Sequence, residues 1–160
     1  MPRDNQRSIL YKWEDRVVAH HSPTELTLDE CQALVNDASS GFPIKPPEIK
    51  AGRSKKQAYG DYQFITLPPW SRRRHIVLHE LAHALVGRFS PRATIQGHGP
   101  EFVSVYIYLL HHYEGFSYSD LFRSISEYNL KWSDSRLIPR FQHDFKPSQS
   151  LVASNKLITY

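Results

Sequence analysis

The sequence has 160 residues, of which 40% are hydrophobic and 22% are charged, and its formal net charge is +4. This composition is typical of a folded domain and excludes a disordered or low-complexity chain. The single cysteine, Cys31, excludes an intramolecular disulfide and a cysteine-based zinc ribbon. We expect one domain over residues 1–160, with its core at about 48–128 and N-terminal helices within 1–40.

The sequence contains no segment that predicts export or membrane insertion. The polar N-terminal residues lead into no apolar stretch, so no signal peptide is expected. The longest apolar run, 102–113, is far shorter than the ~20 residues that a membrane-spanning helix needs. We therefore expect a cytoplasmic protein without membrane contact.

The first expected helix covers residues 4–20. Hydrophobic residues recur every four positions from Ile9 to Val17, which is the spacing of one helix face. Asp4 or Asn5 is a suitable residue to cap its start.

A second helix is expected over about 27–38. Thr27 and Glu30 have the spacing of a capping box, in which each side chain accepts a hydrogen bond from the other residue's backbone N–H. The pattern changes after the proline-rich connector at 42–47.

A small sheet is expected after this connector. Short alternating runs at 48–51, 57–59 and 62–67 are separated by turns that contain glycine. They predict two or three antiparallel strands, and together with the helices they indicate an α+β fold.

The next expected helix, about 71–88, contains the motif H-E-x-x-H. Ser71 is its predicted cap and Gly87 its predicted C-terminal stop. Residues four apart lie on one helix face, so His79 and His83 can point at one metal ion. Glu80 lies beside them, where a carboxylate can accept a proton from a metal-activated water.

A catalytic zinc site usually needs a third protein ligand. His98 is the best candidate, because it lies between two glycines immediately before a helix expected over about 100–113, which Pro100 begins. The main alternative is His75, one turn before His79 on the same helix. Three ligands on one straight helix cannot surround a tetrahedral ion well, so His98 is preferred.

The rest of the chain contains one further expected helix. Ser117 and Asp120 have cap spacing and predict a helix over about 118–128. Beyond it the periodicity is weak, so 129–160 is expected to form an irregular C-terminal extension.

A basic stretch precedes the motif. Between residues 45 and 74 the chain has eight basic and two acidic residues, with aromatic residues interleaved. Three arginines at a helix start oppose the helix dipole, and such a cluster can follow a phosphate backbone. The candidate nucleic-acid contacts are Arg53, Lys55, Lys56, Arg72, Arg73 and Arg74. The simpler interpretation is a solvated start of the helix.

The two halves of the predicted site resemble one family. The run His79-Glu80-Leu81-Ala82-His83 is followed by His98-Gly99-Pro100-Glu101-Phe102, and this combination resembles the SprT-like zinc metalloproteases over about residues 57–115. The resemblance implies a minimal gluzincin-like core, in which a small sheet packs on the zinc-binding helix. Many members also contain a cysteine-rich zinc ribbon, which the single cysteine excludes here.

The resemblance also implies roles for individual residues. His79, His83 and His98 are expected to bind one Zn²⁺ ion, and Glu80 is expected to be the catalytic base. Glu101 matches a family position without being a ligand. A carboxylate in the first turn of a helix is favourable for capping it or for orienting His98.

Two functions follow as hypotheses. The first is a zinc-dependent metallopeptidase that hydrolyses a protein substrate, and the alternative is a non-catalytic zinc-stabilised module that binds DNA or a protein. For the peptidase, Tyr59, Tyr62 or an arginine is expected to stabilise the oxyanion. Its substrate is expected to add as a strand to the sheet edge near 62–67.

Overall fold

The computed structural model describes residues 3–53, 57–89 and 97–133. Within these ranges the chain forms five α-helices and a three-stranded sheet, which confirms the α+β prediction. Most of the predicted extension, 134–160, lies outside the described residues. The elements are α1 (Arg7–Trp13), α2 (Leu28–Ser39), β1 (Glu48–Ala51), β2 (Tyr59–Gly60), β3 (Phe64–Leu67), α3 (Arg74–Phe89), α4 (Pro100–Glu114) and α5 (Tyr118–Glu127).

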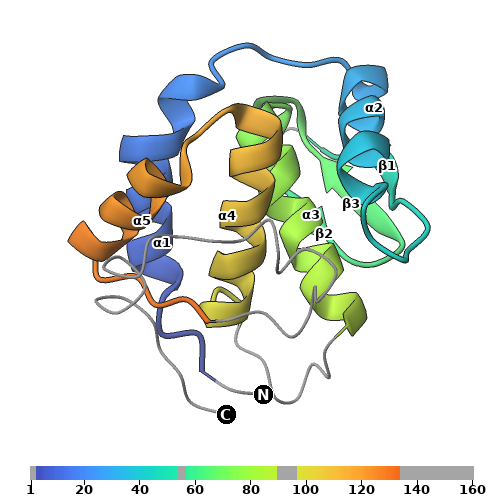
Figure 1. The fold of residues 1–160 in the computed structure, drawn as a ribbon. Coiled ribbons are helices and arrows are strands. Elements are labelled where there is room, and N and C mark those ends of the chain that lie inside the picture. Colours follow the sequence, from blue (N-terminus) through green and yellow to red (C-terminus); the bar gives the residue numbers. More distant parts are fainter. Residues whose placement is uncertain (1–2, 54–56, 90–96, 134–160) are drawn as a thin grey trace.

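Helices α3 and α4 form the centre of the fold. α3 packs against α4 on one side and against the sheet and α2 on the other, while α1 and α5 lie beyond α4 (Figure 1). α4 is buried at every position from Phe102 to Leu110. Proline at its first position and Gly115, with a left-handed φ of 77°, mark its two ends. No helix in the described ranges is long and apolar enough to cross a membrane.

The sheet has the strand order β1-β3-β2. β2 pairs antiparallel with β3, but β1 pairs parallel with β3, so the expected antiparallel arrangement is wrong for β1. An alternating sequence pattern reports which face a residue takes and not which strand it pairs with. β3 is therefore the central strand, and the edge predicted at 62–67 does not exist.

The two remaining edges differ. On the outer edge of β1, the side chain of Gln32 in α2 accepts from the Ile49 N–H at 2.8 Å and donates to the Pro47 carbonyl at 3.0 Å. This amide takes the place of a neighbouring strand. The sheet edge nearest the motif helix belongs to β2.

The N-terminal helix departs from its prediction. α1 begins at Arg7 after the N-cap Gln6, and the chain continues as a π-helix over Glu14–Val18 and a 3-10 turn over Ala19–His21. Asp4 is therefore not the cap, because its carboxylate contacts a histidine far along the chain. The capping box of α2 is confirmed: the Glu30 N–H donates to the Thr27 hydroxyl at 3.1 Å, and the Thr27 N–H donates to the Glu30 carboxylate at 2.9 Å.

The ends of the motif helix also differ from the prediction. Ser71 lies in a 3-10 turn over Pro69–Ser71, and its hydroxyl donates to the Pro68 carbonyl at 2.8 Å, so it does not cap α3. Gly87 lies inside α3, which ends at Phe89. The predicted cap of α5 is confirmed, because the Ser117 hydroxyl accepts from the Asp120 N–H at 3.1 Å.

Candidate metal centre

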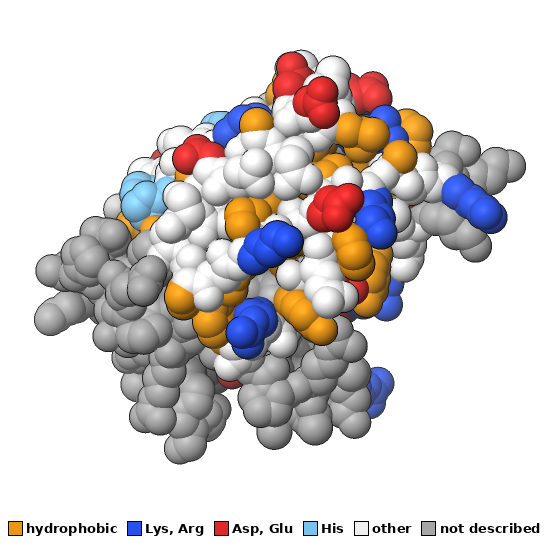
Figure 2. All heavy atoms as spheres, turned by 90° about the vertical axis from the view of Figure 1, so that its right-hand side faces the viewer, with side chains coloured by type: hydrophobic (Ala, Val, Ile, Leu, Met, Phe, Trp, Pro, Cys, Tyr) orange, Lys and Arg blue, Asp and Glu red, His pale blue; other side chains and the backbone are white. Residues whose placement is uncertain are grey.

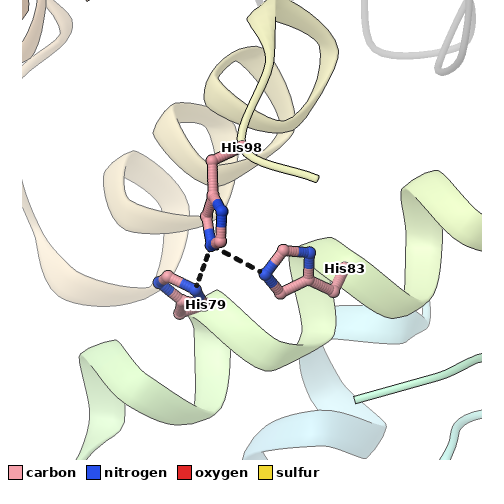
Figure 3. Close-up of side chains that lie close together, drawn as sticks. All are labelled: His79, His83 and His98. Carbon is pink, nitrogen blue, oxygen red and sulfur yellow. Dashed lines mark hydrogen bonds between the residues drawn. The ribbon is translucent and has the colours of Figure 1, made fainter. Parts of the chain in front are cut away.

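Three histidines converge between α3 and α4. His79 and His83 project from one face of α3, and His98 reaches the same point from the segment just before α4 (Figure 3). The Nε2 atom of His98 lies 3.3 Å from that of His79 and 3.1 Å from that of His83. His79 and His98 are buried, and His83 is half-buried. The structure thus brings together the three histidines that the sequence predicted.

The spacing of these nitrogens suits a metal ion. One potential ligand atom from each histidine lies within 4.8 Å of the others. Two imidazole nitrogens at about 2.0–2.1 Å from a tetrahedral zinc ion are separated by about 3.3 Å. The nitrogen pairs at 3.1 and 3.3 Å are close to this value. His75, the alternative third ligand, is buried on α3 and is not part of the group.

A buried carboxylate fixes the orientation of His79. The Nδ1 atom of His79 lies 2.7 Å from Oε2 of Glu14, and the hydroxyl of Tyr106 donates to the same oxygen at 2.6 Å. Burial opposes the charged form of both partners. Their attraction and hydrogen bond outweigh burial, so the pKa of Glu14 is lowered and the pKa of His79 is raised. A proton on Nδ1 leaves the Nε2 lone pair directed at the other histidines.

A second carboxylate holds His98 in the same way. The Nδ1 atom of His98 lies 2.6 Å from Oδ2 of Asp4, and the Gln6 amide donates to the His98 carbonyl at 3.1 Å. A Cβ atom on Gly97 would lie 3.2 Å from Oδ2 of Asp4, so glycine at this position leaves room for the carboxylate. Glu101 lies in the first turn of α4 as expected, but the carboxylate that orients His98 belongs to Asp4.

The surroundings keep two of the histidines uncharged. Burial, followed by the neighbouring His79 and His98, holds the pKa of His83 well below its usual value. Burial also lowers the pKa of His98, although its hydrogen bond to Asp4 opposes that effect. Because metal ions bind the neutral imidazole, this environment favours the form that can act as a ligand.

Glu80 lies beside the three histidines. Its side chain is buried and makes no hydrogen bond to any residue in the described ranges, and it lines a cavity of about 280 Å³ together with His79. Burial raises the pKa of Glu80; nearby Glu14 adds to the effect and His79 opposes it. A Cβ atom on Gly60 would lie 2.4 Å from the Glu80 carbonyl oxygen, so β2 approaches α3 closely at this residue.

Two aromatic residues complete the surroundings of the histidines. Phe102 is fully buried, and its ring centroid lies 4.9 Å from that of His79 and 4.5 Å from that of His83. Tyr11 of α1 stacks on His79 with centroids 5.8 Å apart and an interplanar angle of 6°, and its centroid lies 5.3 Å from that of His98. Burial is the largest cause of a raised pKa for the Tyr11 hydroxyl.

Sequence analysis did not identify Asp4, Glu14, Tyr11 or Tyr106 as site residues. Glu14 lies 65 residues before His79, and Asp4 lies 94 residues before His98. No local spacing connects such pairs, because they meet only through the packing of α1 against α3 and α4. The sequence offered one signal for Glu14, because it is a polar residue on the buried side of an otherwise hydrophobic helix face.

Three of the six predicted nucleic-acid contacts bond to other parts of the fold. The Arg72 guanidinium donates to the Leu67 carbonyl at 3.2 Å, Arg73 donates to the Pro23 carbonyl, and Arg74 pairs with Glu114. Arg53 is exposed, and Lys55 and Lys56 lie outside the described residues. On the face shown in Figure 2, basic side chains are scattered among acidic and hydrophobic ones. Each of the three arginines thus has a partner within the fold at the start of α3, and nucleic-acid contact at these residues stays a prediction.

Comparisons of the chain with models of protein families, with curated proteins and with solved structures found no match. The interpretation of the site therefore depends on its own geometry and on the sequence pattern that surrounds it.

Proposed function

We propose that this chain is a zinc-dependent metallopeptidase related to the SprT-like family. The main support is one arrangement: three histidine Nε2 atoms face one another, and the Glu80 carboxylate lies beside them without a hydrogen bond to any described residue. A site built only to hold a metal ion has no use for a carboxylate that borders a cavity beside the ligands and bonds none of the described residues.

Zinc is the metal that this set of ligands suits best. Three imidazole nitrogens that leave one coordination position open are a frequent ligand set of catalytic zinc. No thiolate or ligating carboxylate is part of the group, which disfavours iron–sulfur and calcium or magnesium binding. When bound, zinc would polarise the substrate carbonyl and make a water molecule more acidic.

In the proposed chemistry Glu80 transfers the proton, and Glu14 and Asp4 orient the histidines. Glu80 accepts a proton from the attacking water and delivers it to the amine that leaves when the peptide C–N bond breaks. Glu14 and Asp4 each accept the Nδ1 proton of one histidine, which fixes the orientation of both rings and leaves each Nε2 lone pair available to a metal ion. The raised pKa of Glu80 brings the carboxyl closer to the pH at which it must both accept and release a proton.

The substrate would bind along β2. Of the two outer strands, β1 has its outer edge bonded by Gln32, and β2 packs directly against Glu80 through Gly60. An extended peptide that pairs with β2 would pass the cavity lined by Glu80 and His79. The proposed substrate-binding edge is therefore β2, in place of residues 62–67, which were expected from the sequence.

The alternative is a zinc-stabilised module that binds DNA or a protein without catalysis. One observation favours it: the three histidines and their two carboxylates connect the N-terminal segment on both sides of α1 with α3 and with the residues just before α4, as a structural metal site would. The internal hydrogen bonds of Arg72, Arg73 and Arg74 favour a protein partner over DNA within this alternative.

The substitution Glu80→Gln distinguishes the two functions. We expect the variant to retain one zinc ion per chain and to cleave casein at least ~100-fold more slowly, because a positioned general base contributes about 10²–10⁴ in rate. Glu127→Gln, on the exposed end of α5, is the matched control and should keep wild-type activity. Equal casein cleavage by Glu80→Gln and the wild type would exclude Glu80 as the base.

A further inference from the structure

The negative charge that develops during hydrolysis needs a group that stabilises it, and the cavity beside Glu80 is the place to look for that group. When water attacks the carbonyl carbon, Glu80 takes its proton and the C=O electron pair moves to the carbonyl oxygen. The proton then passes to the leaving nitrogen as the C–N bond breaks. A positioned hydrogen-bond donor to that oxygen lowers the barrier by stabilising this charge.

We propose that the Tyr11 hydroxyl is this donor. This inference rests on the peptidase function proposed above and adds a catalytic residue to it. Tyr11 lines the same cavity as Glu80, and its ring lies against two of the three histidines, with centroids 5.8 Å from His79 and 5.3 Å from His98. Tyr11 therefore lies between the histidine cluster and the space where the substrate would lie.

Other polar side chains also border the cavity. Arg7, Gln57 and Trp70 also line it. The Arg7 guanidinium lies 5.8 Å from the centroid of the Tyr11 ring, and its charge opposes the rise in the hydroxyl pKa that burial causes.

Tyr11 is also held rigidly for this role. The N-terminal segment is attached to the site on both sides of Tyr11, because Asp4 bonds His98 and Glu14 bonds His79. A donor that is fixed before the reaction needs no reorganisation when the charge appears. Tyr11 is nevertheless 39% exposed, so a substrate can reach it.

The tyrosines expected from the sequence are placed less favourably. Tyr59 and Tyr62 are 55% and 49% exposed, and neither is among the described residues that line the cavity of Glu80. Tyr62 instead borders a separate groove together with Gln32 and Arg88. Tyr62 therefore provides a matched control for the loss of one tyrosine hydroxyl.

The test compares Tyr11→Phe with Tyr62→Phe in the zinc-loaded full chain. Phenylalanine keeps the ring that stacks on His79 and removes only the hydroxyl. We expect Tyr11→Phe to keep its zinc content and its KM for a fluorogenic peptide, while kcat falls by about 10²–10³. Tyr62→Phe should keep the wild-type values of zinc content, KM and kcat.

A binding measurement provides a readout apart from activity. A phosphinic peptide mimics the tetrahedral charged state, and calorimetry on the inactive Glu80→Gln protein measures its affinity without turnover. Adding Tyr11→Phe to this protein should weaken binding by at least about tenfold, because an interaction made with the charged oxygen is lost.

Two results would overturn the assignment of Tyr11. One is a kcat within twofold of wild type in an otherwise active Tyr11→Phe protein; the other is loss of zinc from that variant, which would make the tyrosine a packing residue. If the wild type neither cleaves peptides nor binds the phosphinic peptide, the peptidase proposal fails as well. Activity that depends on Glu80 but not on Tyr11 would overturn only the present inference.

Discussion

The two carboxylate–histidine pairs of the site have nearly the same geometry and very different surroundings. Glu14 and His79 are separated by 2.7 Å, with 8% and 3% of their side chains exposed. Asp4 and His98 are separated by 2.6 Å, with 24% and 9% exposed. Burial, rather than distance, distinguishes them. Glu14 also accepts from Tyr106, whereas Oδ1 of Asp4 has no hydrogen-bond partner among the described residues.

This difference predicts unequal consequences when each pair is broken. Removing one member of a deeply buried pair leaves the other charged or polar group without water or a partner, which is strongly destabilising. At the edge of the molecule, water replaces part of the lost interaction. The Glu14 pair should therefore support both the fold and the metal site, and the Asp4 pair mainly the metal site.

Glu14→Ala should have the largest effect. It leaves the His79 ring and the Tyr106 hydroxyl without their shared acceptor, so we expect the free energy of unfolding to fall by about 3–5 kcal/mol. Zinc affinity should fall about 100-fold, at the upper end of what a carboxylate behind a ligating histidine contributes. Urea unfolding and competition with a fluorescent chelator measure the two quantities. The neighbouring exposed Asp15→Asn is the control, and equal stability of the two variants would contradict the role of Glu14 in the fold.

Asp4→Asn should have an intermediate effect. The amide can still accept one hydrogen bond from His98 but lacks the charge, so zinc affinity should fall about tenfold. The free energy of unfolding of the metal-free protein should change by less than about 1 kcal/mol, as for other partly exposed pairs. If Asp4→Asn lowered the stability of the metal-free protein as much as Glu14→Ala does, the two pairs would contribute equally to the fold and the proposed difference would be wrong.

Tyr106→Phe should have a smaller effect on the metal and a measurable one on the fold. The substitution keeps the buried ring and removes one donor to Glu14, which costs about 1–2 kcal/mol of stability. Zinc affinity should fall only a few-fold, because the bond between Glu14 and His79 remains. A larger loss of zinc than in Asp4→Asn would show that Tyr106, rather than burial, gives the Glu14 pair its importance.

The smallest effect concerns pH in the chelator-treated protein. The pKa of His83 is lowered in the folded chain, so below the unfolded value of about 6.5 the unfolded chain binds more protons and stability falls as the pH falls. His79 acts in the opposite direction: its raised pKa contributes stability that is present below about pH 6.5 and lost as the pH rises through its folded pKa.

The substitution His83→Gln separates these two contributions. Between pH 7 and pH 5 the variant should lose less stability on acidification than the wild type, by at most about 1.4 kcal/mol per pH unit. Urea unfolding curves of both metal-free proteins provide the measurement. Parallel pH profiles would show that His83 is protonated as readily in the fold as in the unfolded chain.

The elements predicted correctly depend on interactions between neighbours in the sequence. The capping box of Thr27, the cap at Ser117 and the two histidines one turn apart on α3 all involve residues within four positions. His98 was also predicted, because the motif and the glycines around it restrict its role. The ends of α3 were missed because Ser71 bonds back to Pro68, and because α3 continues past Gly87 to Phe89, which packs partly buried against the core.

The features that could not be predicted depend on packing between distant segments. β3 lies between β1 and β2 and pairs parallel with β1, and the carboxylate partners of His79 and His98 come from the N-terminal segment, far away in the sequence. The sequence pattern therefore located the three histidines that could hold a metal ion, and only the fold identified the groups that orient them.

The zinc content of the purified chain and of His98→Ala, measured by elemental analysis, tests the central claim most directly. We predict about one zinc ion per wild-type chain, bound by His79, His83 and His98. His98→Ala should contain little zinc after dialysis against a weak chelator, because two histidines on one helix hold zinc poorly. Full zinc occupancy in His98→Ala, or a wild-type chain that binds no zinc, would contradict the three-histidine site.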